Sequence, residues 1–198
     1  MTHQIVVVTA GLSDPSSTRL LADLLAGAAG TALPEAEVTV IELRPLAHAL
    51  TDHLLTGFAT GELAEALAKV AAADGLIVVS PVFSASYSGL FKTFFDVLET
   101  GALDGTPVLI AATAGTARHS LVLEHALRPL FSYLHAVVVP TGVFAATDDF
   151  AGDALRRRVD RAAAELAALV AARPRTAKPD QFDRDLAAMG DFESLLNG

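Results

Sequence analysis

Strand-like and helix-like patterns of hydrophobic residues alternate along the chain. Three runs are continuously apolar, which is typical of strands buried on both faces of a parallel sheet. Another segment alternates polar and apolar residues, a pattern that favours a strand at the margin of the sheet. The last apolar run is short. In chain order, the expected strands cover residues 5–8, 37–43, 75–80, 107–112 and 137–139.

The segments between these strands repeat their apolar residues every three or four positions, as helices do. Leu20, Leu21, Leu24 and Leu25, for example, form a stripe that would face the sheet. Pro129 has no N–H to donate, so we expect a bend there. The predicted helices begin at residue 20 and cover residues 50–55, 62–73, 90–100, 120–134 and 153–172, and residues 81–89 and 142–152 are expected to be loops.

Because each connection is long enough to cross the sheet, the five strands predict an α/β fold with a doubly wound parallel sheet and helices on both faces. With 198 residues, 52% of them hydrophobic, the chain is expected to form one domain around a sizeable core. We assign residues 1–172 to this domain. Residues 173–198 are expected to be an extended tail that docks on a partner subunit. The apolar residues for such docking are Phe182, Phe192, Leu195 and Leu196.

Composition narrows the function classes. A net charge of −9 disfavours a nucleic-acid-binding surface, and it requires any anionic ligand to be held by a local site. The absence of cysteine excludes disulfides, thiolate catalysis and cysteine metal sites. The first residues do not resemble a signal peptide, and residues 5–8 are too short to span a membrane, so we expect a soluble cytoplasmic protein.

Three polar or glycine-bearing segments, residues 11–19, 81–89 and 113–119, directly follow expected strands. They should therefore meet at the carboxyl edge of the sheet, where doubly wound sheets bind their ligands. The first segment precedes a helix, and helix N-termini bind anions through free N–H groups. One of its hydroxyls could serve simply as a helix N-cap, but a cap needs one hydroxyl and the segment has four. The pattern favours a planar ligand that carries a phosphate.

Other site motifs are missing. The first loop is neither a nucleotide-binding P-loop nor a dinucleotide-binding G-x-G-x-x-G turn, and it lacks the acid cluster of a response regulator. The chain also lacks a G-x-S-x-G nucleophile elbow. His119 and His125 have no third ligand in view, so we expect no metal site.

The second segment has the pattern Pro-x-aromatic, then Gly-x-x-Lys-x-x-x-Asp, formed by Pro81, Phe83, Gly89, Lys92 and Asp96. Together with the first loop and Thr113-Ala114-Gly115-Thr116, it resembles the NAD(P)H-dependent FMN reductases of flavodoxin-like fold, whose strand order is 2-1-3-4-5. The branch that serves luciferase-like flavin-dependent monooxygenases looks most similar. Many members begin the first loop with Gly-Ser-x-Arg, whereas Leu12 and Asp14 stand there in this chain.

This resemblance implies an oxidoreductase that takes hydride from NADPH or NADH to FMN. The flavin carries that chemistry, and no side-chain acid or base is obligatory, so no catalytic residue is named. The implied phosphate contacts are Ser13, Ser16, Ser17, Thr18 and Arg19. The implied contacts to the flavin ring are Pro81, Val82, Phe83, Ser84, Ala85, Ser86 and Tyr87 on one side and Thr113, Gly115 and Thr116 on the other. Arg118 and His119 would face the nicotinamide nucleotide or a flavin phosphate.

The resemblance also implies a homodimer or homotetramer and a partner monooxygenase that receives reduced FMN. Lys92 and Asp96 are expected to form an ion pair between helical positions i and i+4, and Phe91, Phe94 and Phe95 to pack in the core or at a subunit interface. The alternatives are an FMN-containing quinone or azo reductase, a flavodoxin-like electron carrier, and a flavin-type fold that has lost its cofactor.

Overall fold

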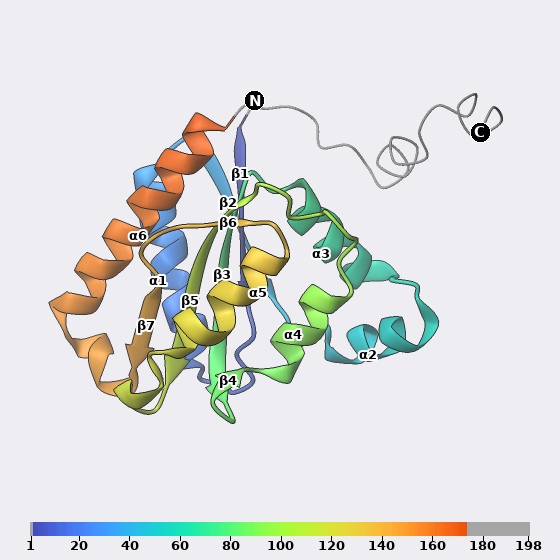
Figure 1. Ribbon diagram of the computed structural model, residues 1–198, viewed down its shortest axis with the longest axis horizontal. Coiled ribbons are helices and arrows are strands. Elements are labelled where there is room, and N and C mark those ends of the chain that lie inside the picture. The colour runs from blue at the N-terminus through green and yellow to red at the C-terminus, as the bar shows by residue number, and fades with distance from the viewer. Residues whose placement is uncertain (1, 174–198) are drawn as a thin grey trace, which may run out of the picture.

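A parallel sheet runs through the middle of the molecule, with strands in the order β2-β1-β3-β5-β6 (Figure 1). The computed structural model describes residues 2–173. These strands are β1 (His3–Thr9), β2 (Ala36–Glu42), β3 (Gly75–Phe83), β5 (Pro107–Ala114) and β6 (Val137–Val138). Counted over the five expected strands, this order is 2-1-3-4-5, the flavodoxin-like order, so the predicted topology is confirmed. The alternating segment, now β2, lies at the edge as expected.

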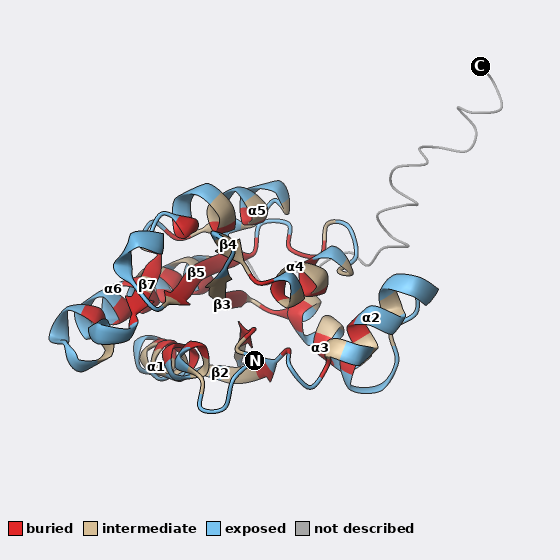
Figure 2. Ribbon diagram, turned by 90° about the horizontal axis from the view of Figure 1, so that it is seen from below, coloured by how far each residue is buried: buried red, intermediate tan, exposed pale blue. Residues whose placement is uncertain are grey.

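Helices cover both faces of the sheet (Figure 2). On one face, α1 (Ser17–Ala32) and α6 (Asp153–Ala172) pack over Ile5 and Val7 of β1. The opposite face carries α2 (Ala47–Thr56), α3 (Gly61–Ala72), α4 (Gly89–Asp96) and α5 (Arg128–Tyr133), packed over Val6 and Val8. Successive residues of β1 thus point to opposite cores, which explains why the run is continuously apolar.

Most predicted helices are present, and the expected core position of the α4 phenylalanines is confirmed. Phe91, Phe94 and Phe95 are at most 2% exposed, and the rings of Phe91 and Phe95 pack against Phe131. The helix predicted for residues 90–100 ends earlier, at Asp96. No helix within residues 2–173 has both the length and the apolar character needed to cross a membrane.

The loop predicted for residues 81–89 is wrong in part. Strand β3 continues to Phe83, and a short strand, β4 (Ser86–Tyr87), folds back on it as a hairpin. The two residues of the turn, Ser84 and Ala85, have φ values of 48° and 67°. Both lie in the left-handed region, which a type I′ hairpin turn requires. The pattern missed this turn because it lacks the Asn-Gly or Asp-Gly sequence that usually marks one.

The loop predicted for residues 142–152 is also wrong in part. Residues Val143–Ala146 form a strand, β7, that pairs with residues 111–114 of β5, and a 3₁₀ turn follows at Thr147–Ala151. Strand β6 pairs with residues 107–108 of the same neighbour. The last strand is therefore split into two short pieces along one edge, and neither piece is long enough to show a clear alternating pattern.

The helix predicted for residues 120–134 is present over residues 122–133, but it is α-helical only in part. A 3₁₀ turn at Ala117–His119 and a π-helical turn at Leu123–Leu127 precede α5. Pro129 lies in the first turn of α5, directly after the wider π turn. Because proline lacks an N–H, the hydrogen-bond ladder changes its spacing at the point where a bend was expected.

The expected tail, with Phe182, Phe192, Leu195 and Leu196, lies outside the described residues. Its first residue, Arg173, follows the end of α6 and donates hydrogen bonds to the hydroxyl of Thr106, at 3.4 Å, and to the carbonyl oxygen of Asp104, at 3.1 Å.

Candidate functional site

The three polar segments do lie together at the carboxyl edge of the sheet, the lower edge in Figure 1. The hydroxyl oxygens of Thr18, in the first turn of α1, and Thr113, near the end of β5, lie 2.8 Å apart and share a buried hydrogen bond. Thr113 is also opposite Pro81 in the pairing of β5 with β3. These contacts join the first, second and third segments, so the predicted convergence is confirmed.

The first segment forms a tight turn before α1. The hydroxyl of Ser16 caps the helix by accepting a hydrogen bond from the backbone N–H of Arg19, at 3.2 Å. Gly11 lies so close to this cap that a Cβ there would sit 2.2 Å from the Ser16 oxygen. One hydroxyl is therefore a cap, while Ser13 and Ser17 stay exposed beside the first N–H groups of the helix, which have no partner within it.

A cleft of about 440 Å³ opens beneath this turn, between α1 and the carboxyl ends of β1 and β2. Thr9 lies in its wall, and its hydroxyl, in a residue only 2% exposed, has no hydrogen-bond partner among the described residues. A buried hydroxyl without a partner is costly, which points to a polar ligand. The lining residues are Thr9, Gly11, Ser13, Asp14, Pro15, Ser16, Arg19, Leu20, Asp23, Glu42 and Arg44.

Arg19, the cation expected to meet a phosphate, is engaged elsewhere. Its Nε donates to Asp23 Oδ1 at 2.8 Å, and its Nη1 donates to Glu42 at the end of β2. The hydrogen bond to Asp23 and the nearby charge of Glu42 raise the pKa of Arg19. Because Asp23 lies one turn further along α1, the Arg19 side chain is drawn along the helix, away from the N-terminal N–H groups.

The second segment forms the β3–β4 hairpin. Its base is fixed by the buried hydroxyl of Ser80, which donates to the carbonyl oxygen of Pro81 and accepts from the N–H of Ser88, each at 2.9 Å. The ring of Tyr87 lies 5.8 Å from that of Phe91, centre to centre, while Phe83 is 47% exposed. The residues predicted to contact the flavin ring therefore differ in burial. Pro81, Val82, Ser86 and Tyr87 are half-buried, and Phe83, Ser84 and Ala85 form an exposed tip.

The third segment is open to solvent beyond Thr113. Gly115, Thr116, Arg118 and His119 are all exposed, and a Cβ on Gly115 would meet nothing within 4 Å. The Thr116 hydroxyl accepts from the N–H of Arg118 at 3.4 Å, which starts the 3₁₀ turn. Among residues 2–173, Arg118 forms no ion pair, so its charge is available to an anionic ligand.

Outside the predicted segment of residues 11–19, pattern reasoning missed four polar residues of the cleft: Thr9, Asp23, Glu42 and Arg44. Thr9 is the polar residue that ends the apolar run of the first strand, and such a position at the carboxyl edge was a usable signal. Asp23 was visible as an i+4 partner of Arg19. Glu42 gave no signal, because its contact with Arg19 depends on the placement of β2 beside β1.

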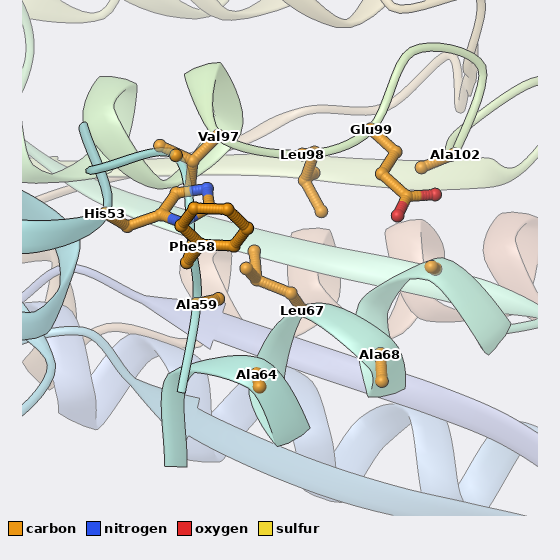
Figure 3. Close-up of a pocket in the computed structure, with 12 residues that line it drawn as sticks. His53, Phe58, Ala59, Ala64, Leu67, Ala68, Val97, Leu98, Glu99 and Ala102 are labelled. Carbon is orange, nitrogen blue, oxygen red and sulfur yellow. The ribbon is translucent and has the colours of Figure 1, made fainter. Parts of the chain in front are cut away.

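A second cavity, of about 570 Å³, lies away from this edge, between the α2–α3 connection, α3 and the segment after α4 (Figure 3). Figure 3 shows the side chains of Phe58, Leu67 and Leu98 at its centre, with His53 beside the ring of Phe58. Nearby, Lys92 and Asp96 form the expected i,i+4 ion pair. Across residues 2–173, no three side chains of His, Asp or Glu are grouped so that they could hold a metal ion.

Comparison with known proteins gives the same family as the motifs. Residues 3–151 match the family model of NADPH-dependent FMN reductase. An FMN reductase (NADPH) from Pseudomonas aeruginosa is 44% identical over 170 residues, covering 83% of this chain and 90% of that protein. The NADH-dependent FMN reductase SfnF from Pseudomonas fluorescens is 42% identical, with the same coverage. An oxidoreductase structure from Corynebacterium diphtheriae is 50% identical with a TM-score of 0.85, covering 87% of this chain and 99% of that one. The chain therefore belongs to the NADPH-dependent FMN reductase family, as a flavodoxin-like oxidoreductase that uses FMN and a reduced nicotinamide nucleotide.

Proposed function

We propose that this protein reduces FMN that exchanges with solution and supplies the reduced flavin to a flavin-dependent monooxygenase. The observation that carries the proposal is the open phosphate end of the site. Ser13, Asp14 and Pro15 are exposed there, and Arg19 is already paired with two carboxylates. Such an end has hydrogen-bond donors for a phosphate but no unpaired arginine from its own turn, which suits a flavin that binds and leaves.

The residues of the edge fit FMN. The unpartnered Thr9 hydroxyl, the exposed Ser13 and Ser17, and the first N–H groups of α1 can donate to a phosphate, and the first turn of α1 contains no acidic residue to repel it. The β3–β4 hairpin would lie along the ring on one side, and Thr113, Gly115 and Thr116 on the other. Bound FMN supplies the redox chemistry by accepting hydride from the nicotinamide. The role of the protein is to place the two rings together, so we assign no catalytic side chain.

The exposed Arg118 and His119 are the proposed contacts for the phosphates of the nicotinamide nucleotide. Relatives of similar identity are named as NADPH-dependent and as NADH-dependent enzymes. Both NADPH and NADH are therefore candidate donors for this protein. We also propose that it acts in the cytoplasm.

We also propose a homodimer through the face that carries the second cavity. Phe58 lines this cavity and is 78% exposed, and Leu55, on the neighbouring helix α2, is 82% exposed. Large exposed apolar groups of this kind suit a subunit interface. Leu55→Lys should shift the protein to a smaller species in analytical ultracentrifugation. Ala168→Lys, at an exposed position on α6, should leave the association state unchanged. If both variants associate to the same extent as the wild type does, this face is not the subunit interface.

The activity is tested by following nicotinamide absorbance with NADPH or NADH and added FMN. Oxidation that depends on free FMN supports the proposal, and absence of oxidation with either donor would contradict it. Oxidation that needs a quinone despite excess FMN would instead favour a quinone reductase. Retention of FMN through extensive dialysis would favour a carrier with a fixed flavin.

Delivery of reduced flavin is tested with a luciferase-type monooxygenase as acceptor, since its light emission reports the arrival of reduced FMN. Emission should require this protein, a nicotinamide donor and FMN together. Emission that does not exceed the level without this protein would refute the delivery step.

A further inference from the structure

We propose that Asp23 and Glu42 lower the affinity of the site for the phosphate of FMN by holding the guanidinium of Arg19 and opposing an incoming anion. The inference rests on the proposed function, because it assigns what these side chains do at the phosphate end of the exchangeable flavin site. It adds two carboxylates that no binding motif includes and that act through Arg19.

The geometry places three charges in one wall of the cleft. Arg19 donates to Asp23, one turn further along α1, and to Glu42, at the end of β2. All three side chains line the cleft beneath the turn that precedes α1. Their side chains are 38%, 49% and 50% exposed, so the pairs are accessible to solvent and can open. Together they carry one net negative charge, because two carboxylates surround one guanidinium.

The surroundings suggest a role beyond stability. Exposed ion pairs contribute little to folding, so a pair of carboxylates on one arginine needs another reason. The first turn of α1, where an anion would bind, contains no acidic residue, and the acid of this helix lies one turn further on, against Arg19. The first helical turn thus has no acid, while the guanidinium of Arg19 is neutralised by two carboxylates; the exposed Asp14, before the helix, and Arg44 also line the cleft. A protein that must release FMN gains from this arrangement, since a free arginine would hold the phosphate more tightly.

The consequence concerns selectivity as well as affinity. Riboflavin has the same ring as FMN but no phosphate, so a carboxylate that opposes the phosphate should affect FMN alone. Removing the charge of Glu42 releases Nη1 of Arg19 and takes one negative charge out of the cleft. FMN should then bind more tightly, and the preference for FMN over riboflavin should increase.

The test measures dissociation constants for FMN and riboflavin by the quenching of flavin fluorescence on the flavin-free full chain, without turnover. Glu42→Gln should tighten FMN roughly two- to fivefold, the range expected when one exposed ion pair is lost. Asp23→Asn should act in the same direction, and riboflavin binding should stay unchanged in both variants. The matched control is Glu37→Gln, because Glu37 lies on the same strand and pairs with the amide of Gln4, not with the cleft.

A second variant shows whether the effect passes through Arg19. In an Arg19→Ala background, Glu42→Gln should tighten FMN by less than half as much as it does in the wild type. Weaker or unchanged FMN binding in both carboxylate variants would overturn the proposal. So would an equal change for riboflavin, an equal change in the Glu37→Gln control, or an undiminished effect without Arg19. These outcomes are separate from the proposed function, which depends on wild-type NAD(P)H oxidation with free FMN.

Discussion

The hydrogen bond between Thr18 and Thr113 gives a prediction about how the site is held together. Both side chains are buried, at 3% and 2% exposure, and their hydroxyls lie 2.8 Å apart across 95 positions of the sequence. Thr18→Val or Thr113→Val removes one hydroxyl and leaves the other buried without a partner. The double variant removes both, so that two apolar groups of similar shape face each other.

The two cases differ in free energy. A buried polar group that loses its partner costs about 1–3 kcal/mol, whereas replacement of both partners by apolar groups of the same shape is nearly neutral. We therefore expect each single variant to lose about 1–3 kcal/mol of unfolding free energy. The double variant should lose clearly less than the sum of the two. For a chain of this size, each kcal/mol corresponds to a decrease in Tm of about 2–4 °C.

Urea unfolding of the wild type, both single variants and the double variant measures this coupling directly. Thr31→Val serves as a control, because the Thr31 hydroxyl is exposed and bonds only locally, to the carbonyl oxygen of Gly27. That control should change stability by less than about 0.5 kcal/mol. If the losses of the two single variants simply add in the double variant, the hydroxyls do not depend on each other and the reasoning fails.

Three further predictions concern other parts of the fold. Burial raises the pKa of Glu165, but hydrogen bonds from Thr141 and Arg161 outweigh it and lower the pKa overall, so this carboxylate stabilises the fold above its ordinary pKa of 4.5 and loses that effect as the pH falls through its folded value. Glu165→Gln should therefore flatten the decrease of Tm in acid, and an unchanged profile of Tm against pH would contradict this. Ala85→Gly should raise stability by up to about 1 kcal/mol, measured by urea unfolding, because its φ of 67° suits glycine, and a loss of stability would show that the turn is not strained. Gly75→Ala should cost about 1–3 kcal/mol in the same assay, since its Cβ would lie 2.6 Å from a methyl group of α6, and a neutral result would mean that this packing is loose.

The parts of the fold that the sequence predicted are those with strong local patterns. Strands buried on both faces must be continuously apolar, so β1, β3 and β5 were visible as runs between helical stripes. The alternation of polar and apolar residues in β2 indicated its edge position, because a strand at the edge of the sheet is less completely buried. Given five such strands with long connections, few sheet orders remain possible, which is why the topology could be expected before the structure.

The errors occurred where a contact with a neighbouring element decides the conformation. Strand β7 has only four residues, and what makes it a strand is the free edge of β5 beside it. The β3–β4 hairpin depends on Ser80 bonding to Ser88, and two residues with positive φ follow from that closure. Neither feature has a local period or a characteristic turn sequence, so reading the sequence element by element could not find them.

Arg19 shows the same limit within the site. Its place in a serine-rich turn at a helix N-terminus indicated a phosphate ligand, since an anion there would meet both a helix dipole and a cation. The structure adds Glu42, which β2 brings to the same cleft because it pairs in register with β1 up to Thr9. The charge at this end of the site is thus set by two elements that are adjacent in space but not in sequence. If Glu42 acts as we propose, the phosphate affinity of this protein depends on the residue that ends the second strand as well as on the first loop.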